Sequence, residues 1–531
     1  MNRAQAPAHV LLLAACAWAP ACGLNQAGVD PPSNTIAYPA SAVMDRTGEW
    51  LLVTNSNADL RFNDGSLMAF SLRRAAMDRG GTRYQCPSVN YPNPTTDEPN
   101  FCCRDALDPN ITNCDERSYI GAADDTEHKG LGNVRIGSFA AGMVLQTFTL
   151  NDTGVSRACP QFDSGGMACP NVCDDYKNLA DRLYIGVRGD TSLTYVDIES
   201  TDPDPSMPDV GPPPPKIKCV GNPAQPSVDF ATCDDDHRVI TAMSALASAT
   251  EDEHPPLIPL PDEPYALAYD EAHGLVYIGH LSGNSARAFT GGFSLFDVAP
   301  TGESSGLGDL EKPRFIAPFP SPFTPNSVGS VGITALTNTS NGLFASSRYV
   351  PQVAGLGSTA QCPGMLREIA GYPNGNNFNP PLVGSETRGI RFVNGRAFVL
   401  QRSPPALVGF QGSTPTDVLE TCGSPTFLDK YPDRRDPSDP NNANSDVPET
   451  RLFVTCFADG EIYVYDPSIP RLVKTFLVGR GPSGLVFDEP RKVAYVVGFG
   501  DNNISVIDLD PAHETQYHVV QRIGFPRVTP R

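Results

Sequence analysis

The sequence predicts an all-β fold built from one repeated four-stranded unit, and three observations support this prediction. Short stretches of alternating apolar residues recur along the chain, separated by a few polar residues as in β-hairpins. Glycine and proline are frequent, with 47 and 52 of the 531 residues, which suits a chain rich in turns. Similar segments return at intervals of roughly forty residues or more, which is typical of repeat folds.

The most regular segment is residues 476–510, FLVGRGPSGLVFDEPRKVAYVVGFGDNNISVIDLD. We expect a first strand that ends at Gly479 and a turn at Pro482. Three further strands follow, over residues 484–488, 493–498 and 504–509. Because only short polar turns separate these strands, the segment predicts a four-stranded meander.

Similar units occur upstream. Clear copies span residues 38–72, 264–298 and 450–479, and weaker copies span 137–198, 330–349 and 387–410. One meander cannot bury both of its faces, whereas blades packed around an axis bury both and leave only short edges. Four strands per unit and hairpin connections are typical of a β-propeller. We therefore predict a single seven-bladed β-propeller of four-stranded antiparallel blades.

The end of the chain supplies an expectation about closure of the ring. Residues 517–527, YHVVQRIGFPR, match the strand that precedes the proline turn of a blade, and no further blade follows. We expect this strand to complete the blade that begins at Tyr38, so that both termini close one blade. Pairing of the termini would resist unzipping of a ring in which each blade contacts only its neighbours.

Aspartates recur at equivalent places in the units, at Asp45, Asp270, Asp297, Asp488 and Asp508. Their regular spacing indicates turn residues that accept backbone N–H groups rather than a binding site.

The motif VAYVVGFGDNNISVIDLD at residues 493–510 resembles the YVTN family of β-propeller repeats, and LLVTNSNAD at 51–59 is a second near match. The resemblance is strong over 450–510, fair over 38–72 and 264–298, and weak between them. It implies a seven-bladed propeller and implies no activity, because the family motif is structural. The chain departs from compact members of the family through its long insertions.

The N-terminus resembles a bacterial lipoprotein signal. Arg3 precedes a short apolar run, residues 10–18, which suits a secretory signal better than a membrane span. The tetrapeptide LAAC that ends at Cys16 resembles a lipobox, and APACG around Cys22 is a second candidate. Ordinary cleavage after an Ala-x-Ala site is the alternative. We expect lipid attachment, such as palmitate, at Cys16 or Cys22.

These features predict three parts of the chain: a signal peptide over 1–21, a tether over 22–33 and the propeller over 34–531. Insertions are expected at about 75–130, 152–180, 199–262 and 423–449. The residue after either candidate cysteine, Ala17 or Gly23, is not aspartate. By resemblance to lipoprotein sorting signals, this favours export to the cell envelope and anchoring in the outer membrane, with the membrane face left open.

Cysteine usage agrees with export. The chain has 14 cysteines, and an even number in an exported protein predicts disulfides. We expect Cys219 to pair with Cys233 and Cys422 with Cys456, while the adjacent Cys102 and Cys103 each need another partner. A zinc site is the less favoured alternative. The disulfide candidates are Cys86, Cys102, Cys103, Cys114, Cys159, Cys169, Cys173, Cys219, Cys233, Cys362, Cys422 and Cys456.

Charge and motifs limit the chemistry. The formal net charge of −21 opposes binding to nucleic acid. Asp433, Asp436 and Asp439 are weak calcium candidates in an acidic loop, but they lack the glycine and terminal glutamate of an EF-hand loop. None of the eight histidines lies in a His-Glu-x-x-His or Gly-x-Ser-x-Gly context. We expect no bound cofactor.

The sequence favours a binding or scaffolding module whose partner is an envelope protein or a surface ligand. Long cysteine-bearing loops on a rigid scaffold suit recognition. We expect contact with the membrane only through the lipid anchor, and either a monomer or one part of an envelope complex. The alternative is a lactonase-like or other hydrolase with a site at the central channel mouth, which would need convergent carboxylates and a histidine there. A structural envelope protein without a discrete ligand is a third hypothesis.

Overall fold

The structure is a computed structural model of the whole chain. It describes residues 31–32, 34–79, 102–105, 107–120, 133–151, 154–157, 178–201, 213–219, 231–233, 237–242, 258–270, 274–281, 292–298, 312–319, 332–339, 342–348, 353–355, 385–412, 414–431 and 450–524. In this part of the chain, no helix has the length and apolar character needed to cross a membrane.

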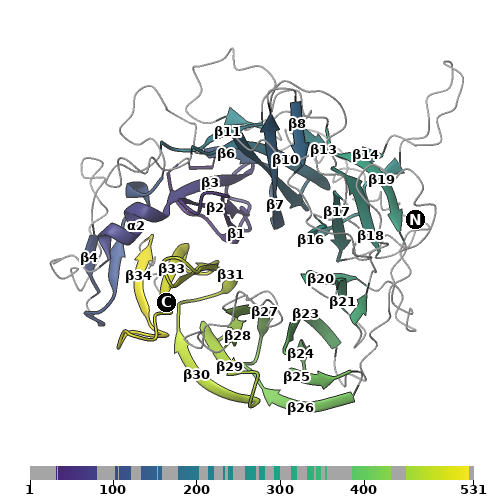
Figure 1. Ribbon diagram of the computed structural model, residues 1–531. Coiled ribbons are helices and arrows are strands. Elements are labelled where there is room, and N and C mark those ends of the chain that lie inside the picture. The colour runs from purple at the N-terminus through teal and green to yellow at the C-terminus, as the bar shows by residue number, and fades with distance from the viewer. Residues whose placement is uncertain are drawn as a thin grey trace, which may run out of the picture.

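The described residues form antiparallel sheets arranged around a central channel (Figure 1). The first sheet contains β1 (Pro39–Met44), β2 (Trp50–Asn55), β3 (Gly65–Ser71) and β6 (Asn133–Ile136). The second contains β7 (Ala140–Asn151), β9 (Asn178–Val187), β10 (Ser192–Glu199) and β11 (Lys216–Lys218), with β8 (Gly154–Arg157) and β13 (Arg238–Val239) attached. The third contains β16 (Pro264–Asp270), β17 (Leu275–His280), β18 (Phe293–Asp297) and β19 (Arg314–Phe319).

The ring continues with a three-stranded sheet of β20 (Ile333–Thr339), β21 (Gly342–Ser347) and β22 (Val353–Gly355). Two regular meanders follow. They are β23 (Ser385–Val393), β24 (Arg396–Ser403), β25 (Pro405–Gln411) and β26 (Thr414–Glu420), then β27 (Pro425–Tyr431), β28 (Arg451–Cys456), β29 (Glu461–Asp466) and β30 (Arg471–Leu477). The last sheet contains β31 (Pro482–Asp488), β32 (Val493–Gly498), β33 (Asn503–Asp508) and β34 (Val519–Ile523).

Minor elements lie outside these meanders. They are α2 (Leu72–Asp78), a 3-10 turn (Glu116–Ser118), β4 (Cys102–Arg104), β5 (Thr112–Cys114), β12 (Ala231–Thr232), β14 (Thr241–Ala242) and β15 (Ile258–Pro259). The strands β12 and β5 run parallel to their partners β6 and β34, so the prediction of purely antiparallel pairing holds only within the meanders.

The propeller arrangement is confirmed, but the predicted number of blades is wrong. The described strands form six blades of four or more strands instead of seven. The remaining sheet, β20–β22, packs between the third blade and β23 and has three strands among the described residues. The sequence after it, GYPNGNNFNPPLVG at 371–384, has no alternating apolar run, and its prolines lack the N–H that a ladder strand donates.

The predicted closure by the termini is also wrong. The last strand, β34, pairs with β33 of its own blade, and β6 takes the outer place in the first blade. A local turn favours this arrangement, because the N–H of Tyr517 bonds to Asp508 O at 2.8 Å. Pairing with the preceding strand closes a short loop, whereas pairing with the first blade would close nearly the whole chain.

The ring is closed instead by side-by-side packing of the first and last blades. Arg491 donates to the carbonyl oxygen of Gly48 at 2.6 Å and to the carboxylate of Glu49 at 2.8 Å. The N–H of Tyr38 donates to Asn502 Oδ1 at 2.6 Å. The hairpin β4–β5, which belongs to the insertion after β3, adds to the outer edge of β34 (Figure 1). The first blade is therefore latched to the last one by an insertion rather than by the termini.

Burial explains why these segments form strands. The second and third strands of a blade are sandwiched between neighbouring blades, so every residue of β32 and β33 is buried. The outermost strands face solvent on one side, and most residues of β26 and β30 are exposed. Inner strands are partly buried because one side faces the channel. Fully buried strands therefore show nearly continuous apolar sequences, as in VAYVVG.

The interpretation of the recurrent aspartates as turn residues is confirmed at three of them. Asp45 accepts the N–H groups of Glu49 and Trp50 at 3.2 and 3.0 Å. Asp488 accepts the N–H of Arg491 at 3.1 Å, and Asp508 accepts the N–H of Asp510 at 2.9 Å.

Three disulfides join described cysteines. The expected pairs Cys219–Cys233 and Cys422–Cys456 are both present. The third pair, Cys102–Cys114, crosslinks the hairpin β4–β5, and Cys103 is also disulfide-bonded. The other candidates lie outside the described residues: Cys86, Cys159, Cys169, Cys173 and Cys362.

Candidate ligand pocket at the channel mouth

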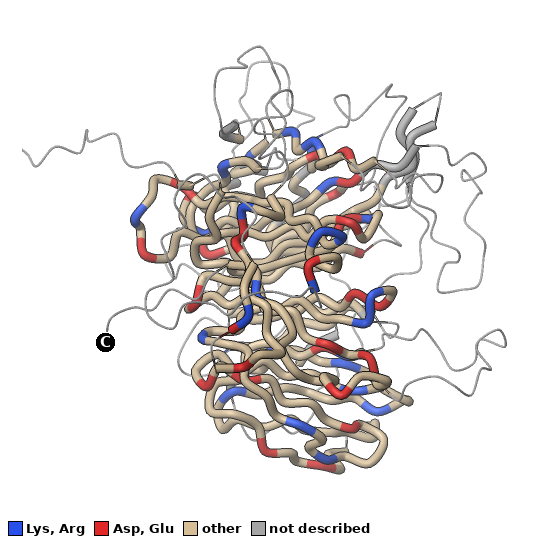
Figure 2. The backbone as a smooth tube through the Cα atoms, turned by 90° about the vertical axis from the view of Figure 1, so that its left-hand side faces the viewer, with Lys and Arg blue, Asp and Glu red and all other residues tan. Residues whose placement is uncertain are grey.

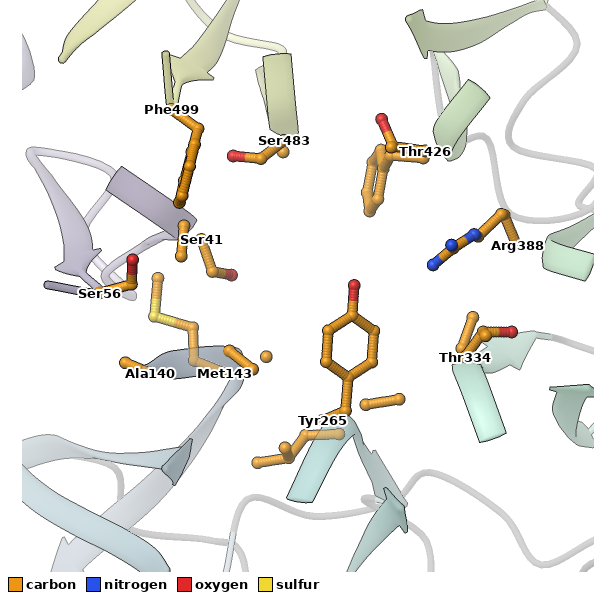
Figure 3. A pocket seen from close by; sticks show the side chains of 18 of the residues that line it. Ser41, Ser56, Ala140, Met143, Tyr265, Thr334, Arg388, Thr426, Ser483 and Phe499 are labelled. Atoms are coloured by element: carbon orange, nitrogen blue, oxygen red, sulfur yellow. The ribbon is translucent and has the colours of Figure 1, made fainter. Parts of the chain in front are cut away.

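The innermost strands meet around a pocket of about 510 Å³ (Figure 3). Residues of β1, β7, β16, β20, β23, β27 and β31 all line it, so the pocket lies in the central channel. This volume falls in the range of roughly 300–1,000 Å³ that is usual for small-molecule sites.

A β-bulge at the start of each inner strand sets which side chain faces the pocket. The pairing of β16 with β17 skips Tyr265, and the pairing of β23 with β24 skips Arg388. Bulges redirect a side chain out of the regular alternation. The skipped residues of six strands all line the pocket: Ala40, Tyr265, Thr334, Arg388, Thr426 and Ser483. In β7 the irregularity lies between Ala140 and Met143, and Ala141 and Gly142 line the pocket there.

A second group of lining residues lies at the end of the second strand, or just after it, in five of the sheets. The N–H of Arg188 bonds to Phe139 O at 3.3 Å, and the N–H of Phe499 bonds to Gly481 O at 2.9 Å. Both residues therefore occupy the same place in their sheets. The lining residues of this group are Ser56, Arg188, Arg402, Phe457 and Phe499.

A residue just before or at the start of several inner strands has a left-handed backbone. The φ angles are 53° at Tyr38, 58° at Phe139, 53° at Glu263 and 55° at Glu386. Such conformations cost of order 1 kcal/mol or more in a non-glycine residue. Their recurrence at one place indicates a shared geometry by which the chain enters the channel wall.

Two arginines from neighbouring strands share one carboxylate beside the pocket. Glu386 lies 3.4 Å from Arg388 Nη2 and 3.5 Å from Arg402 Nε. Arg388 is only 11% exposed, and its Nε atom is buried without a hydrogen-bond partner. In Figure 3, the guanidinium group of Arg388 points into the pocket. This side of the channel mouth therefore presents the end of a largely buried cation.

A third arginine, Arg188 of the second blade, also lines the pocket. Arg188 Nη2 donates to Glu263 Oε1 at 2.9 Å, and its Nε is buried without a partner. Its guanidinium carbon is 5.9 Å from the ring centroid of Tyr265, within reach of a cation–π contact. Tyr265 itself extends with its hydroxyl toward the middle of the pocket (Figure 3).

The arc of the mouth formed by the last two blades is aromatic. The rings of Phe457 and Phe499 are 5.9 Å apart, and the ring of Tyr38 is 5.4 Å from that of Phe499. Small residues keep the remaining wall open. A Cβ at Gly142 would lie 2.7 Å from Tyr265 O, so the close approach of β7 to β16 requires glycine there.

None of the sequence-predicted site residues that the structure describes lines this pocket. The described disulfide cysteines lie elsewhere in the fold, and Cys16, Cys22, Asp433, Asp436 and Asp439 lie outside the described residues. Among the described residues, no group of three or more histidine, cysteine or acidic side chains has a metal-binding arrangement. Acidic and basic residues are interspersed on the side shown in Figure 2.

The lining arginines were missed although a sequence signal exists. Four inner strands begin with proline, and the next residue is the bulged one that faces the channel, as in Pro264-Tyr265 and Pro482-Ser483. Alignment of the repeats on that position would have placed Arg388 in the same ring. The side-chain direction, however, follows from the bulge and not from regular strand alternation.

His280, at the end of β17, is a buried histidine that could be taken for a catalytic residue. Its Nδ1 lies 3.0 Å from Asp262 O, and its Nε2 lies 2.8 Å from Ser294 Oγ. Burial lowers the pKa of His280 to about 4. It is fully buried and does not line the pocket, so it is a neutral structural residue.

Comparisons with known proteins find similar solved structures at low identity. No family model and no curated protein matches the chain. A crystal structure of a protein from Lactobacillus plantarum is similar, with 12% identity, coverage of 76% of this chain and 90% of that one, and a TM-score of 0.40. A putative 6-phosphogluconolactonase from Bacteroides fragilis is similar, with 12% identity, coverage of 72% and 97%, and a TM-score of 0.37.

Proposed function

We propose that this chain is an exported, lipid-anchored module of the bacterial envelope that binds a ligand at the mouth of its propeller channel. The observation that carries the proposal is the pocket itself, which combines buried cationic donors on one arc with aromatic rings on the other. A pocket with a few convergent polar groups and an apolar wall is the usual form of a binding site. The lipobox-like N-terminus supplies the tether.

Binding fits the lining better than hydrolysis does. The described lining residues include hydroxyl groups and guanidinium groups, but neither a carboxylate nor an imidazole. A general base must lie within hydrogen-bond reach of the proton that it abstracts. The described wall of the pocket supplies no such group, so we do not propose a hydrolase.

The tether is tested by the intact mass of the protein purified from its native membrane. We expect the mass of a chain that begins at Cys16 or Cys22 and carries lipid. A mature chain that begins after Ala21 without added lipid would overturn this part of the proposal and support ordinary cleavage.

Binding at the channel is tested by affinity capture from detergent-solubilised envelopes. Ser483→Trp places a large ring at a bulged position that faces the pocket, whereas Val418→Trp alters an exposed position of β26 and serves as the control. We expect a ligand, identified by mass spectrometry, that co-purifies with the wild type and the control but not with Ser483→Trp. The same ligand yield from all three proteins would contradict binding in the channel.

A further inference from the structure

We infer that the channel pocket takes a small organic anion, with a carboxylate or phosphate head held by Arg388 and its neighbours and an apolar body against the aromatic arc. The inference deepens the proposed function and rests on it. The first argument is the charge of the pocket wall. Arg188, Arg388 and Arg402 line it, and no acidic residue is among its described lining residues.

The charge of the arginines is only partly balanced by their neighbours. Arg388 and Arg402 share the single carboxylate of Glu386, and Arg188 pairs with Glu263. These described residues comprise three guanidinium groups and two carboxylates. These described residues of the mouth therefore carry a net positive charge, in a chain whose formal net charge is −21. Such a local field attracts small anions into a cleft while the remaining surface does not.

The geometry of Arg388 strengthens the argument. Its side chain is only 11% exposed, and its Nη2 lies 3.4 Å from Glu386 Oε2. The end of its guanidinium group points into the pocket (Figure 3). An anionic oxygen in the pocket suits this end, because charge-assisted bonds to guanidinium are strong and often bidentate.

The hydroxyl of Tyr265 is available on the same side. No described group forms a hydrogen bond with it, and it points into the pocket (Figure 3). The other hydroxyls at bulged positions bond to backbone instead: Thr334 donates to Thr387 O, and Ser483 donates to Pro39 O at 3.2 Å. Tyr265 and Arg388 both project from the wall into the pocket (Figure 3).

The aromatic arc determines the rest of the ligand. Phe457 and Phe499 offer apolar surface next to the cationic arc, and a pocket of about 510 Å³ exceeds the size of an inorganic ion. A ligand with only a charged head would leave the aromatic surface uncovered. The combination therefore favours an anion with an aromatic or aliphatic body.

The test is calorimetric titration of the full mature protein in detergent. The probes are phenylacetate, phenyl phosphate, inorganic phosphate and the neutral phenylacetamide. We expect one of the two aromatic anions to bind, and the stronger one identifies the head group. Phenylacetamide should bind about tenfold or more weakly, since it lacks the charge that the arginines recognise.

Variants assign the binding to the pocket. Arg388→Gln should weaken the aromatic anion about tenfold or more, and Arg388→Lys should restore part of the loss. Arg396→Gln removes an arginine at the opposite end of β24 from Arg402 and should leave binding unchanged. Phe499→Ala should weaken the aromatic anion but not inorganic phosphate. If Arg388→Gln fails to unfold cooperatively, Arg402→Gln replaces it.

The outcomes separate this inference from the proposed function. Absence of binding by both aromatic anions, or equal binding by wild type and the Arg388 or Arg402 variant, overturns the anion site. If affinity capture then still yields a ligand that Ser483→Trp releases, channel binding stands and only its anionic class is wrong. If neither experiment detects a ligand, both proposals fail.

Discussion

The two halves of the ring differ in how much chain they place outside the blades. In the half from β23 to β34, short turns join most successive strands, and one long insertion separates β27 from β28. In the half from β1 to β22, residues 72–132 separate β3 from β6, and residues 152–177 separate β7 from β9. Both halves nevertheless contribute bulged inner strands to one pocket.

This difference indicates that the geometry of the channel wall does not depend on the insertions. The insertion after β3 leads to the outer strand of its blade, and extra strands such as β5 and β12 add to sheet edges. Inner strands keep the same bulge in both halves because its geometry depends only on pairing with the second strand. Arg188 from the expanded half and Arg388 from the compact half therefore reach the same pocket.

The halves also differ in what they bury. The expanded half buries the ion pair Arg182–Asp197 and the neutral His280. Both halves bury large aromatic residues, such as Phe70 and Phe453, but in the compact half the paired arginine Arg396 is partly exposed. We expect the expanded half to be the more sensitive to loss of a polar partner, and the following predictions test this, from the largest effect to the smallest.

Arg182→Met should lower the free energy of unfolding by about 3–5 kcal/mol, because it leaves the carboxylate of Asp197 buried without its cation. Arg182 Nε and Nη2 donate to this carboxylate at 2.6 and 3.0 Å. The matched control is Arg396→Met, since Arg396 also stacks on a ring but pairs with the partly exposed Asp417. Its cost should stay near or below 1 kcal/mol. Urea unfolding measures both, and equal losses would contradict the comparison.

Removal of a disulfide should lower the free energy of unfolding slightly more in the compact half than in the expanded half. The bridge Cys422–Cys456 spans 34 residues, against 14 for Cys219–Cys233. Loop-closure entropy predicts losses of about 4 and about 3 kcal/mol for the two double alanine variants. Denaturant unfolding without reductant measures them. A markedly larger loss for the shorter loop would show that packing of the expanded half, and not chain entropy, dominates.

Acid should destabilise the protein through His280, in the expanded half. Burial holds the pKa of His280 at about 4, below its ordinary 6.5. Between these values the unfolded chain binds the proton and the folded one does not. Stability is therefore lost as pH falls through this window, by roughly 3 kcal/mol. We expect His280→Gln to remove this loss when unfolding is compared at neutral pH and near pH ~4.5.

Asp181 gives a response of the opposite sign in the same half. Burial raises its pKa from 3.8 to about 6, so the folded protein takes up this proton first and gains stability as pH falls through that window. Asp181→Asn should therefore steepen the acid loss caused by His280. An unchanged or shallower profile in this variant would contradict the assignment.

The smallest effects concern two buried tyrosine hydroxyls. Tyr465→Phe removes a bond to Glu420 O of 2.7 Å and should cost about 1 kcal/mol. Tyr184→Phe in the expanded half removes a bond to Gln146 Oε1 of 2.6 Å and leaves that oxygen buried, so its cost should be larger, about 1–3 kcal/mol. Thermal unfolding ranks them, and the reverse order would weaken the contrast between the halves.

Much of the local structure was predictable. The strand over 493–498 matches β32 to the residue, and the turn function of Asp45 and Asp488 followed from their recurrence. The pairs Cys219–Cys233 and Cys422–Cys456 also followed from spacing and strand position. Hairpins, turns and short-range crosslinks depend on residues close in sequence, so the pattern of apolar and turn residues carries them.

The sequence by itself thus determined the all-β class, the repeated meander and the turns that join its strands. Only the tertiary structure decided the number of complete blades, the pairing of β34 with β33, and the latch of β5 on β34. It also decided that Tyr265, Arg388 and Arg188 share one pocket. These features join residues far apart in sequence, and bulges turn the side chains, so strand alternation alone does not reveal where they point.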